Sequence, residues 1–244
     1  MPENGLEALK RACRYAFITN KKEYCGAQDA FKSFQAFLEK PSEQNANTVR
    51  SLFPSFEGLY AYLTLIAHSN GRDPLDSEVI EAYWIGNALL DAISLSQLQR
   101  MIRDQLGAPR LLPKRVAEEK ASKLKESLFP NHAFHVLYIN FMTSKVAPIQ
   151  AHLNNCLIHA GRVESIHDEN LTVKGTWLSV NERGFSIGEM VREVQQGRLP
   201  NPREGDWISI HWNEAVETLS FEEVKRLQYY TDENMQRINR VRFP

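Results

Sequence analysis

The residues best suited to chemistry in this sequence are cysteines and histidines that lie far apart along the chain. Cys156 opens the stretch Cys-Leu-Ile-His-Ala-Gly-Arg-Val, and His211 lies in the later stretch Gly-Asp-Trp-Ile-Ser-Ile-His-Trp. Each stands at the edge of a predicted short strand, within one small β-unit. A thiolate and an imidazole bind soft and borderline transition metals, and a thiolate is also a nucleophile. The pair therefore predicts a soft-metal site or a site of sulfur chemistry.

Cys25 is a second candidate, and its position predicts a thiol of lowered pKa. It follows Tyr24 and precedes Gly26, just ahead of a helix predicted to begin near Ala27. Free amide groups at a helix N-terminus stabilise a thiolate. We therefore predict that Cys25 is catalytic and that Tyr24 contributes to cofactor binding. The alternative is that Cys25 is an ordinary loop cysteine.

Cys156 can be read in two ways. Asn154 and Asn155 before it predict a turn and some exposure, which favours a catalytic or metal-ligating thiolate. Cysteine is also among the most buried residue types, so the alternative is a small packing residue. Cys13 lies on the apolar face of the first predicted helix and is assigned to the core.

His132 and His135 are predicted metal ligands, on condition that this part of the chain is helical. Their spacing of three places both imidazoles on one face of a helix, whereas on a strand they would point to opposite faces. The residues after them favour a strand, so the pair depends on a helical turn after Pro130. His159 and His167 are expected to face solvent.

Glu81 belongs to a polar and aromatic group on one predicted helix, together with Tyr83, Trp84 and Asn87. Residues three or four apart share a helix face, so the group could line a pocket, with Glu81 as a cofactor-binding residue. More often such a group lies at a helix interface with satisfied hydrogen bonds, and this second interpretation is favoured.

Two kinds of structure must position these residues. Apolar residues recur at helical spacing up to about residue 128, which predicts helices over 6–17, 26–38, 55–67, 74–93, 94–106 and 114–128. From Asn131, β-branched and aromatic residues up to Phe141 and short apolar runs after Cys156 predict strands. Ser220 and Glu223 have capping-box spacing at the start of a last helix. The predicted fold is α+β, with a helical domain at 1–130 and an OB-like barrel plus C-terminal helix at 131–244.

Composition limits the partners. The 29 basic and 30 acidic residues among 244 are interspersed, so neither nucleic acid nor a membrane surface is favoured as a partner. The start of the chain does not resemble a signal peptide, and no long apolar run is present, which predicts a cytoplasmic protein. The three cysteines argue against a disulfide framework. Motifs for nucleotide binding, serine hydrolysis and structural zinc are missing from the sequence.

Residues 156 to about 239 resemble the HypC/HupF family of hydrogenase maturation factors. The matching residues are Cys156, Leu157, Gly161, Val163, Ile166, Gly205, Asp206, His211, Ala215, Phe221, Glu222 and Glu223. The resemblance implies an OB-like barrel that carries iron with cyanide and carbon monoxide ligands. It also implies Cys156 as the thiolate ligand, with His211 as a second ligand or its support. The sequence departs from the family in the internal position of Cys156, in a missing proline before Gly161, and in Asn213 in place of a glycine.

The sequence therefore predicts an accessory or maturation protein for a metalloenzyme, with NiFe hydrogenase as the leading case. Its partners would be other metallocentre maturation proteins or the hydrogenase large subunit, and its cofactor would be iron. Two alternatives remain: an enzyme that synthesises or inserts a diatomic ligand or other one-carbon unit, and a non-catalytic interaction module.

We also expect candidate residues from distant parts of the chain to form one site. Cys25, His132 and His135 from the first part of the chain should face Cys156 and His211 in one site. This requires the Cys156 sulfur to lie within about 12 Å of His132 or His135, given metal–ligand distances of roughly 2.0–2.3 Å.

Overall fold

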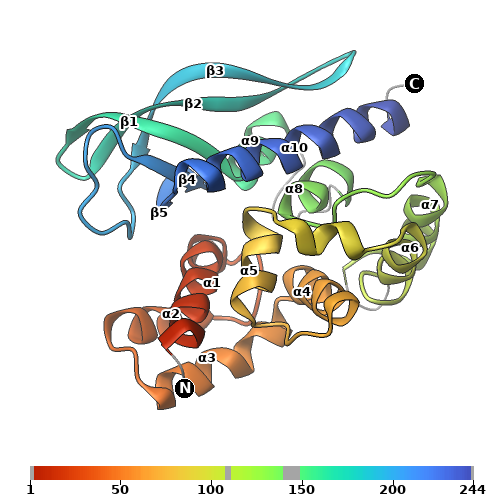
Figure 1. Cartoon of the computed structure of the whole chain (residues 1–244), viewed down its shortest axis with the longest axis horizontal. Helices are drawn as coiled ribbons and strands as arrows, with labels where there is room; N and C mark the ends of the chain where they lie inside the picture. Colours follow the sequence, from red (N-terminus) through yellow and green to blue (C-terminus); the bar gives the residue numbers. More distant parts are fainter. Residues whose placement is uncertain (1–2, 108–110, 140–148, 243–244) are drawn as a thin grey trace.

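Helices form the first part of the chain, and a five-stranded sheet with a long helix forms the last part (Figure 1). The structure is a computed structural model that describes residues 3–107, 111–139 and 149–242. The helical elements are α1 (Glu3–Lys21), α2 (Ala30–Glu39), α3 (Glu43–Leu52), η1 (Phe53–Ser55), α4 (Glu57–Asn70), α5 (Ser77–Trp84), η2 (Ala88–Ala92), α6 (Leu95–Asp104), α7 (Lys114–Lys123), α8 (His132–Phe134), η3 (His135–Ile139), α9 (Gln150–Cys156) and α10 (Phe221–Arg242). The strands are β1 (His159–His167), β2 (Asn170–Asn181), β3 (Gly184–Gln195), β4 (Trp207–His211) and β5 (Glu214–Thr218). The predicted α+β class is confirmed.

Side-chain caps set where several helices begin. Ser94 and Gln97 form a capping box at the start of α6. The helix predicted to begin at Pro74 begins instead at Ser77, because the Asp76 carboxylate accepts the free backbone N–H of Glu78. It also ends earlier than predicted, at Trp84, with Gly86 at a φ of 100° soon afterwards.

The predicted strand between residues 134 and 141 is wrong over the part that the structure describes, because His132–Ile139 is helical. Asn131 caps this segment by accepting the backbone N–H of Phe134. The side chains from Val136 to Ile139 are buried, so the stretch is apolar on every side, and periodicity cannot separate a buried helix from a strand. Phe141 lies outside the described residues.

The five strands pair in the order β1-β2-β3-β5-β4, and β4 pairs back with β1. All neighbours are antiparallel except β3 and β5, which meet at the single parallel pair Gln195–Glu214. A hairpin turn at residues 167–170 joins β1 to β2, with Asp168 at a φ of 53°. One group of apolar residues fills the sheet interior: Val163, Leu171, Val173, Trp177, Val194, Leu199, Ile208, Ile210 and Ala215.

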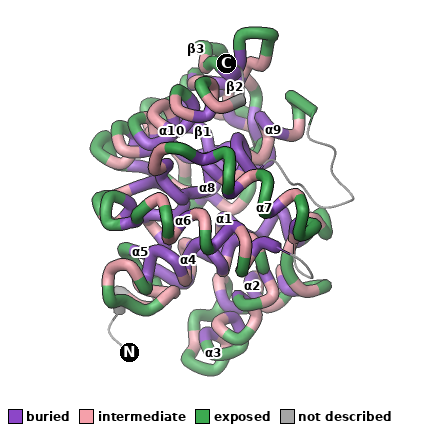
Figure 2. The backbone as a smooth tube through the Cα atoms, turned by 90° about the vertical axis from the view of Figure 1, so that its right-hand side faces the viewer, coloured by how far each residue is buried: buried purple, intermediate pink, exposed green. Residues whose placement is uncertain are grey.

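A second and larger apolar core runs from the helices into one side of the sheet, so that buried segments of both parts meet in the middle of the molecule (Figure 2). Helix α10 lies between the sheet and α8, and it contacts both (Figure 1). Its buried Asn234 donates to the carbonyl oxygen of Phe129 and accepts from the Phe129 backbone N–H. These bonds fix the segment that leads into α8. The division of the chain at residue 130 stays a prediction.

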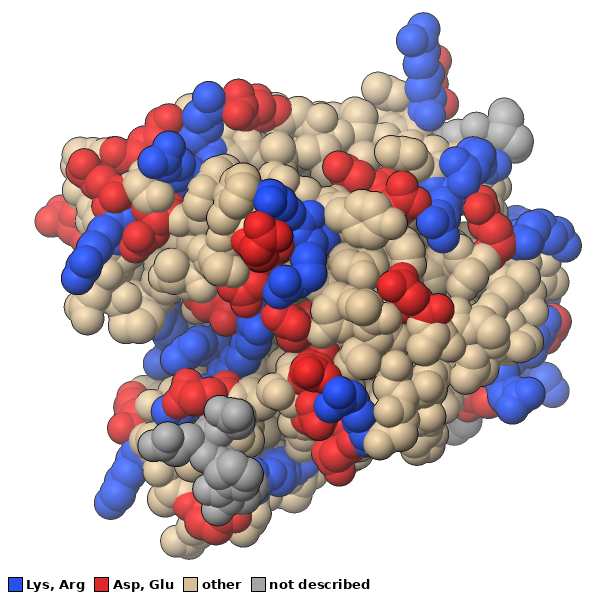
Figure 3. All heavy atoms as spheres, in the orientation of Figure 1, with Lys and Arg blue, Asp and Glu red and all other residues tan. Residues whose placement is uncertain are grey.

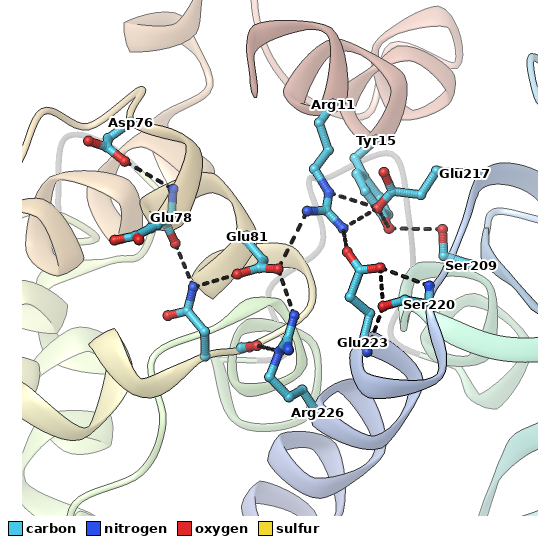
Figure 4. A network of polar contacts seen from close by, with 12 residues as sticks. Arg11, Tyr15, Asp76, Glu78, Glu81, Ser209, Glu217, Ser220, Glu223 and Arg226 are labelled. Carbon is cyan, nitrogen blue, oxygen red and sulfur yellow. Dashed lines mark hydrogen bonds and ion pairs between the residues drawn. The ribbon is translucent and has the colours of Figure 1, made fainter. Parts of the chain in front are cut away.

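A network of ion pairs also joins the two parts (Figure 4). Arg11 of α1 lies 2.7 Å from carboxylate oxygens of both Glu217 on β5 and Glu223 on α10. Arg226 of α10 forms an ion pair with Glu81 of α5 at 2.7 Å. The hydroxyl of Tyr15 lies 2.8 Å from Glu217 Oε1 and 2.8 Å from Ser209 Oγ. These contacts hold α1, α5, the sheet and α10 in one relative position.

Basic and acidic side chains alternate over the face shown in Figure 3, without a stripe of one sign. Among the described helices, none is both long and apolar enough to span a bilayer.

Candidate functional site

A cavity of about 110 Å³ lies where α1, α5 and α8 meet the end of α9 and the end of β4. Two cysteines and three histidines line it: Cys25, Cys156, His132, His135 and His211. Among the described residues that line the cavity, none is Asp, Glu, Lys or Arg. The tertiary structure therefore brings together the five sulfur and imidazole groups that the sequence places far apart.

Three of these side chains form a tight group. Three ligand atoms, one from each of His132, Cys156 and His211, lie within 4.8 Å of one another. The Sγ atom of Cys156 is 3.8 Å from Nε2 of His132. This distance is far inside the limit of about 12 Å set from the sequence. A tetrahedral ion with ligand distances of about 2.0–2.3 Å holds its ligands about 3.3–3.8 Å apart. Small side-chain rotations would therefore bring the three donor atoms to metal-binding distance.

His211, the last residue of β4, has one ring nitrogen fixed and the other free. Its Nδ1 lies 3.0 Å from the backbone carbonyl oxygen of Tyr15, which can only accept, so Nδ1 carries the proton. Nε2 is therefore a lone-pair donor; it is buried, and none of the described residues donates a hydrogen bond to it. Burial lowers the pKa of His211 well below its usual value, so the ring is neutral. A neutral imidazole oriented by a backbone carbonyl is the form that ligates metals.

His132 is held by two hydrogen bonds. Its Nε2 lies 2.8 Å from the carbonyl oxygen of Cys156 and must donate, so the Tyr83 hydroxyl, 3.0 Å away, donates to Nδ1. Burial lowers the pKa of His132 to about 4. Ligation through Nε2 requires the proton to move to Nδ1, where the Tyr83 oxygen can accept it. Tyr83 therefore supports both tautomers of His132.

Cys156 is the last residue of α9, so the predicted turn at Asn154 and Asn155 is wrong. Helix α9 continues through this pair because the side chain of Asn154 bonds to the backbone of Leu178 on β2. Burial raises the pKa of the Cys156 thiol to about 12, although the nearby Trp212 indole opposes the rise. Deprotonation of this thiol therefore requires a compensating cation, such as a metal ion.

Cys25 lines the cavity, but it does not sit at a helix N-terminus as predicted. Helix α2 begins only at Ala30, after Asp29, and Cys25 lies in the irregular segment between α1 and α2. Burial raises the pKa of its thiol to about 11, which reverses the predicted lowering. The Cys25 thiol lies 3.1 Å from Thr19 Oγ1. Tyr24 also lines the cavity, with its ring 4.7 Å from that of Trp212.

His135 lies beside His132 as the helical spacing predicts, with ring centroids 6.5 Å apart. Its Nδ1 is 3.2 Å from the Tyr62 hydroxyl, and burial lowers the pKa of the ring to about 3. His135 is not part of the group of three donors within 4.8 Å. It lines the cavity without reaching the centre of the group.

Glu81 lies outside the cavity lining, so the structure does not bring it together with the other predicted site residues. Its carboxylate forms an ion pair with Arg226 and accepts from Asn87 Nδ2 at 2.9 Å (Figure 4). These bonds match the helix-interface interpretation. The residues that sequence reasoning missed are Tyr83 as the partner of His132 and the backbone carbonyl of Tyr15. A backbone oxygen leaves no signal in a sequence.

His159 is buried, which corrects the prediction that it faces solvent. Its Nε2 lies 2.7 Å from the Asn154 carbonyl oxygen and its ring 4.7 Å from that of Trp177. Burial lowers the pKa of His159 to about 4. His167 is exposed, as predicted.

The pKa of His159 predicts a loss of stability in acid. Folding lowers the pKa of His159 from its usual 6.5 to about 4. The contribution of its neutral ring to the free energy of unfolding is therefore fully present above pH 6.5 and is lost as the pH falls towards 4. At about 1.4 kcal/mol per pKa unit, this one residue accounts for roughly 3 kcal/mol. Urea unfolding between pH 7 and 4 should show a shallower pH dependence in His159→Gln, whose amide can still donate to Asn154. The exposed control His167→Gln should follow the wild type; equal slopes in all three proteins would contradict the prediction.

Comparison with known proteins places the chain in one family. No curated protein and no solved structure matches it. A family model matches residues 6–243, which includes the residues from α1 to β4 that line the cavity. The resemblance to HypC/HupF stays a prediction. Because the match covers nearly the whole chain, the protein belongs to DUF6390, a family of unknown function.

Proposed function

We propose that this protein binds one transition-metal ion through His132, Cys156 and His211 and acts as an accessory protein in metalloenzyme assembly. The observation that carries the proposal is the buried, unbonded Nε2 of His211, which lies within 4.8 Å of two other donor atoms. An unsatisfied buried polar atom costs about 1–3 kcal/mol. A metal ion would remove that cost.

The type of donor narrows the choice of ion. One thiolate and two neutral imidazoles suit iron, cobalt, copper and zinc better than magnesium or calcium, which prefer oxygen ligands. The described lining offers no carboxylate, which is the usual ligand of the harder ions. Binding would release the thiol proton of Cys156, since the thiolate is the ligating form.

Iron and a hydrogenase recipient come from the resemblance of residues 156–239 to HypC/HupF. In this proposal the strands form an OB-like barrel, and Cys156 carries iron or an iron–diatomic fragment in the cytoplasm. The partners would be other maturation proteins or the large subunit of NiFe hydrogenase. The support is that Cys156 and His211, the two residues implied by the resemblance, share one cavity.

An enzyme is the second candidate, and the size of the cavity favours it. About 110 Å³ is enough for a small molecule beside the ion. An open coordination position facing such a space is typical of catalytic metal sites. Turnover of a one-carbon or cyanide-donor substrate by the loaded protein would decide for this candidate. A protein that neither binds metal nor turns over substrate would leave the non-catalytic interaction module.

Anaerobic titration of the metal-free protein with Fe(II), followed by elemental analysis after gel filtration, tests the proposal. We expect one iron per chain in the wild type and in Cys13→Ala, a core cysteine outside the cavity lining. We expect none in Cys156→Ala. Iron bound equally by Cys156→Ala, or not bound by the wild type, would overturn the proposal. Passage of ⁵⁷Fe from the loaded protein to a metal-free hydrogenase large subunit would distinguish a carrier from an enzyme.

A further inference from the structure

Cys25 carries a partly buried thiol that the three-ligand site leaves unused. It lines the same cavity as Cys156, and a negative charge on Cys25 raises the pKa of Cys156. Among the described residues, its thiol donates one side-chain hydrogen bond, to the Thr19 hydroxyl, and a thiol is a weak donor. Tyr24, the neighbouring residue, packs on Trp212, which directly follows His211. The segment that carries Cys25 therefore lies against the end of the strand that carries His211.

Charge balance in the cavity calls for a second anionic ligand. A divalent ion held by one thiolate and two neutral imidazoles keeps a net charge of +1. An uncompensated charge is costly in a buried site, and no described lining residue is Asp or Glu. Two thiolates with two imidazoles would make the site neutral and complete a tetrahedral ligand set. Among the described lining residues, Cys25 carries the second thiol, and a thiol ionises more readily than the phenols of Tyr24 and Tyr83.

We propose that Cys25 is the fourth ligand of a divalent ion, so that the loaded site is a closed set of Cys25, Cys156, His132 and His211. This rests on the proposed three-ligand site and extends it. Cys25 lies outside the group of donors within 4.8 Å, so its sulfur must leave Thr19 and move into the cavity on loading. Each thiol gives one proton to solvent as its bond to the metal forms, and no electron is transferred.

In a closed ligand set, protein side chains occupy every coordination position of the ion. Structural sites saturate the ion with protein ligands, whereas catalytic sites keep one position open for water or substrate. Ligation by Cys25 therefore favours a site that holds the ion over a site that catalyses a reaction on it. It also predicts that loss of Cys25 weakens the binding of divalent ions but not that of Cu(I). The single charge of Cu(I) is already neutralised by the Cys156 thiolate alone.

Co(II) alone, added anaerobically to the full-length protein, is the probe. Its thiolate-to-cobalt charge-transfer band grows with the number of thiolate ligands, and its visible bands are intense only in tetrahedral geometry. We expect two-thiolate intensity in the wild type and in the control Cys13→Ala. In Cys25→Ser we expect about half that intensity, an affinity for Co(II) at least about tenfold weaker, and unchanged affinity for Cu(I).

The outcomes separate this inference from the proposed function. If Cys25→Ser binds one cobalt with the full wild-type band, Cys25 is not a ligand, and the three-ligand site stands. If the wild type binds no cobalt, both proposals fail. Alkylation of the wild type with iodoacetamide, read by mass spectrometry, covers the case of a variant that does not fold. Cobalt should protect both Cys25 and Cys156, and protection of Cys156 alone would overturn the inference.

Discussion

Replacing His211 by asparagine is expected to weaken Fe(II) binding by more than about 100-fold while leaving the fold intact. The asparagine Nδ2 can still donate to the Tyr15 carbonyl oxygen, which now accepts from His211 Nδ1. The variant therefore keeps the structural hydrogen bond and removes only the free lone pair at Nε2. Loss of a supporting residue alone costs 10–100-fold in metal affinity, and loss of a ligand should cost more. Anaerobic titration with Fe(II) measures the change.

Tyr83→Phe and His167→Asn complete this series. Tyr83→Phe removes the partner of His132 Nδ1 and should cost about 10–100-fold, less than the loss of His211. His167→Asn changes an exposed histidine on β1 and should bind iron as the wild type does. A His211→Asn protein that binds Fe(II) within threefold of the wild type would exclude His211 as a ligand.

Replacing Arg11 by methionine should lower the free energy of unfolding by about 3–5 kcal/mol at neutral pH. Arg11 and Glu217 are 18% and 11% exposed, and Arg11 also pairs with Glu223, so its loss leaves carboxylates in the interior without their cation. Methionine keeps most of the aliphatic volume, which isolates the charge. Urea unfolding followed by circular dichroism measures the effect.

Two comparisons show whether charge is the cause. Burial already raises the pKa of Glu217, and loss of Arg11 should raise it further. The penalty should therefore be present above the usual glutamate pKa and should shrink as the pH falls from 7 towards 5. Adding Glu217→Gln to Arg11→Met should recover part of the loss. Arg240→Met, which breaks an exposed pair with Glu126, should cost no more than about 1 kcal/mol; equal losses in both variants would contradict the argument.

Much of the fold could be predicted from local sequence, because helices and strands carry their own periodicity and caps. The capping box predicted from the spacing of Ser220 and Glu223 is formed at the start of α10 and shows this directly. Prediction failed between His132 and Ile139, where burial on every side removes the periodicity that separates a helix from a strand. It failed again at Asn154, whose turn preference is overridden by its bonds to β2.

The sequence by itself determined the α+β class and the kind of chemistry, because residue type alone sets which metals sulfur and imidazole can bind. Only the tertiary structure decided which groups share a site. It placed Cys25, His132, His135, Cys156 and His211 around one cavity and moved Glu81 into an ion-pair network elsewhere. It also reversed the expected pKa shift of Cys25, because desolvation depends on the packing of distant segments. Nε2 of His211 keeps its lone pair because Nδ1 donates to the backbone carbonyl oxygen of Tyr15. A contact between such distant parts of the chain cannot be predicted from the local sequence of either part.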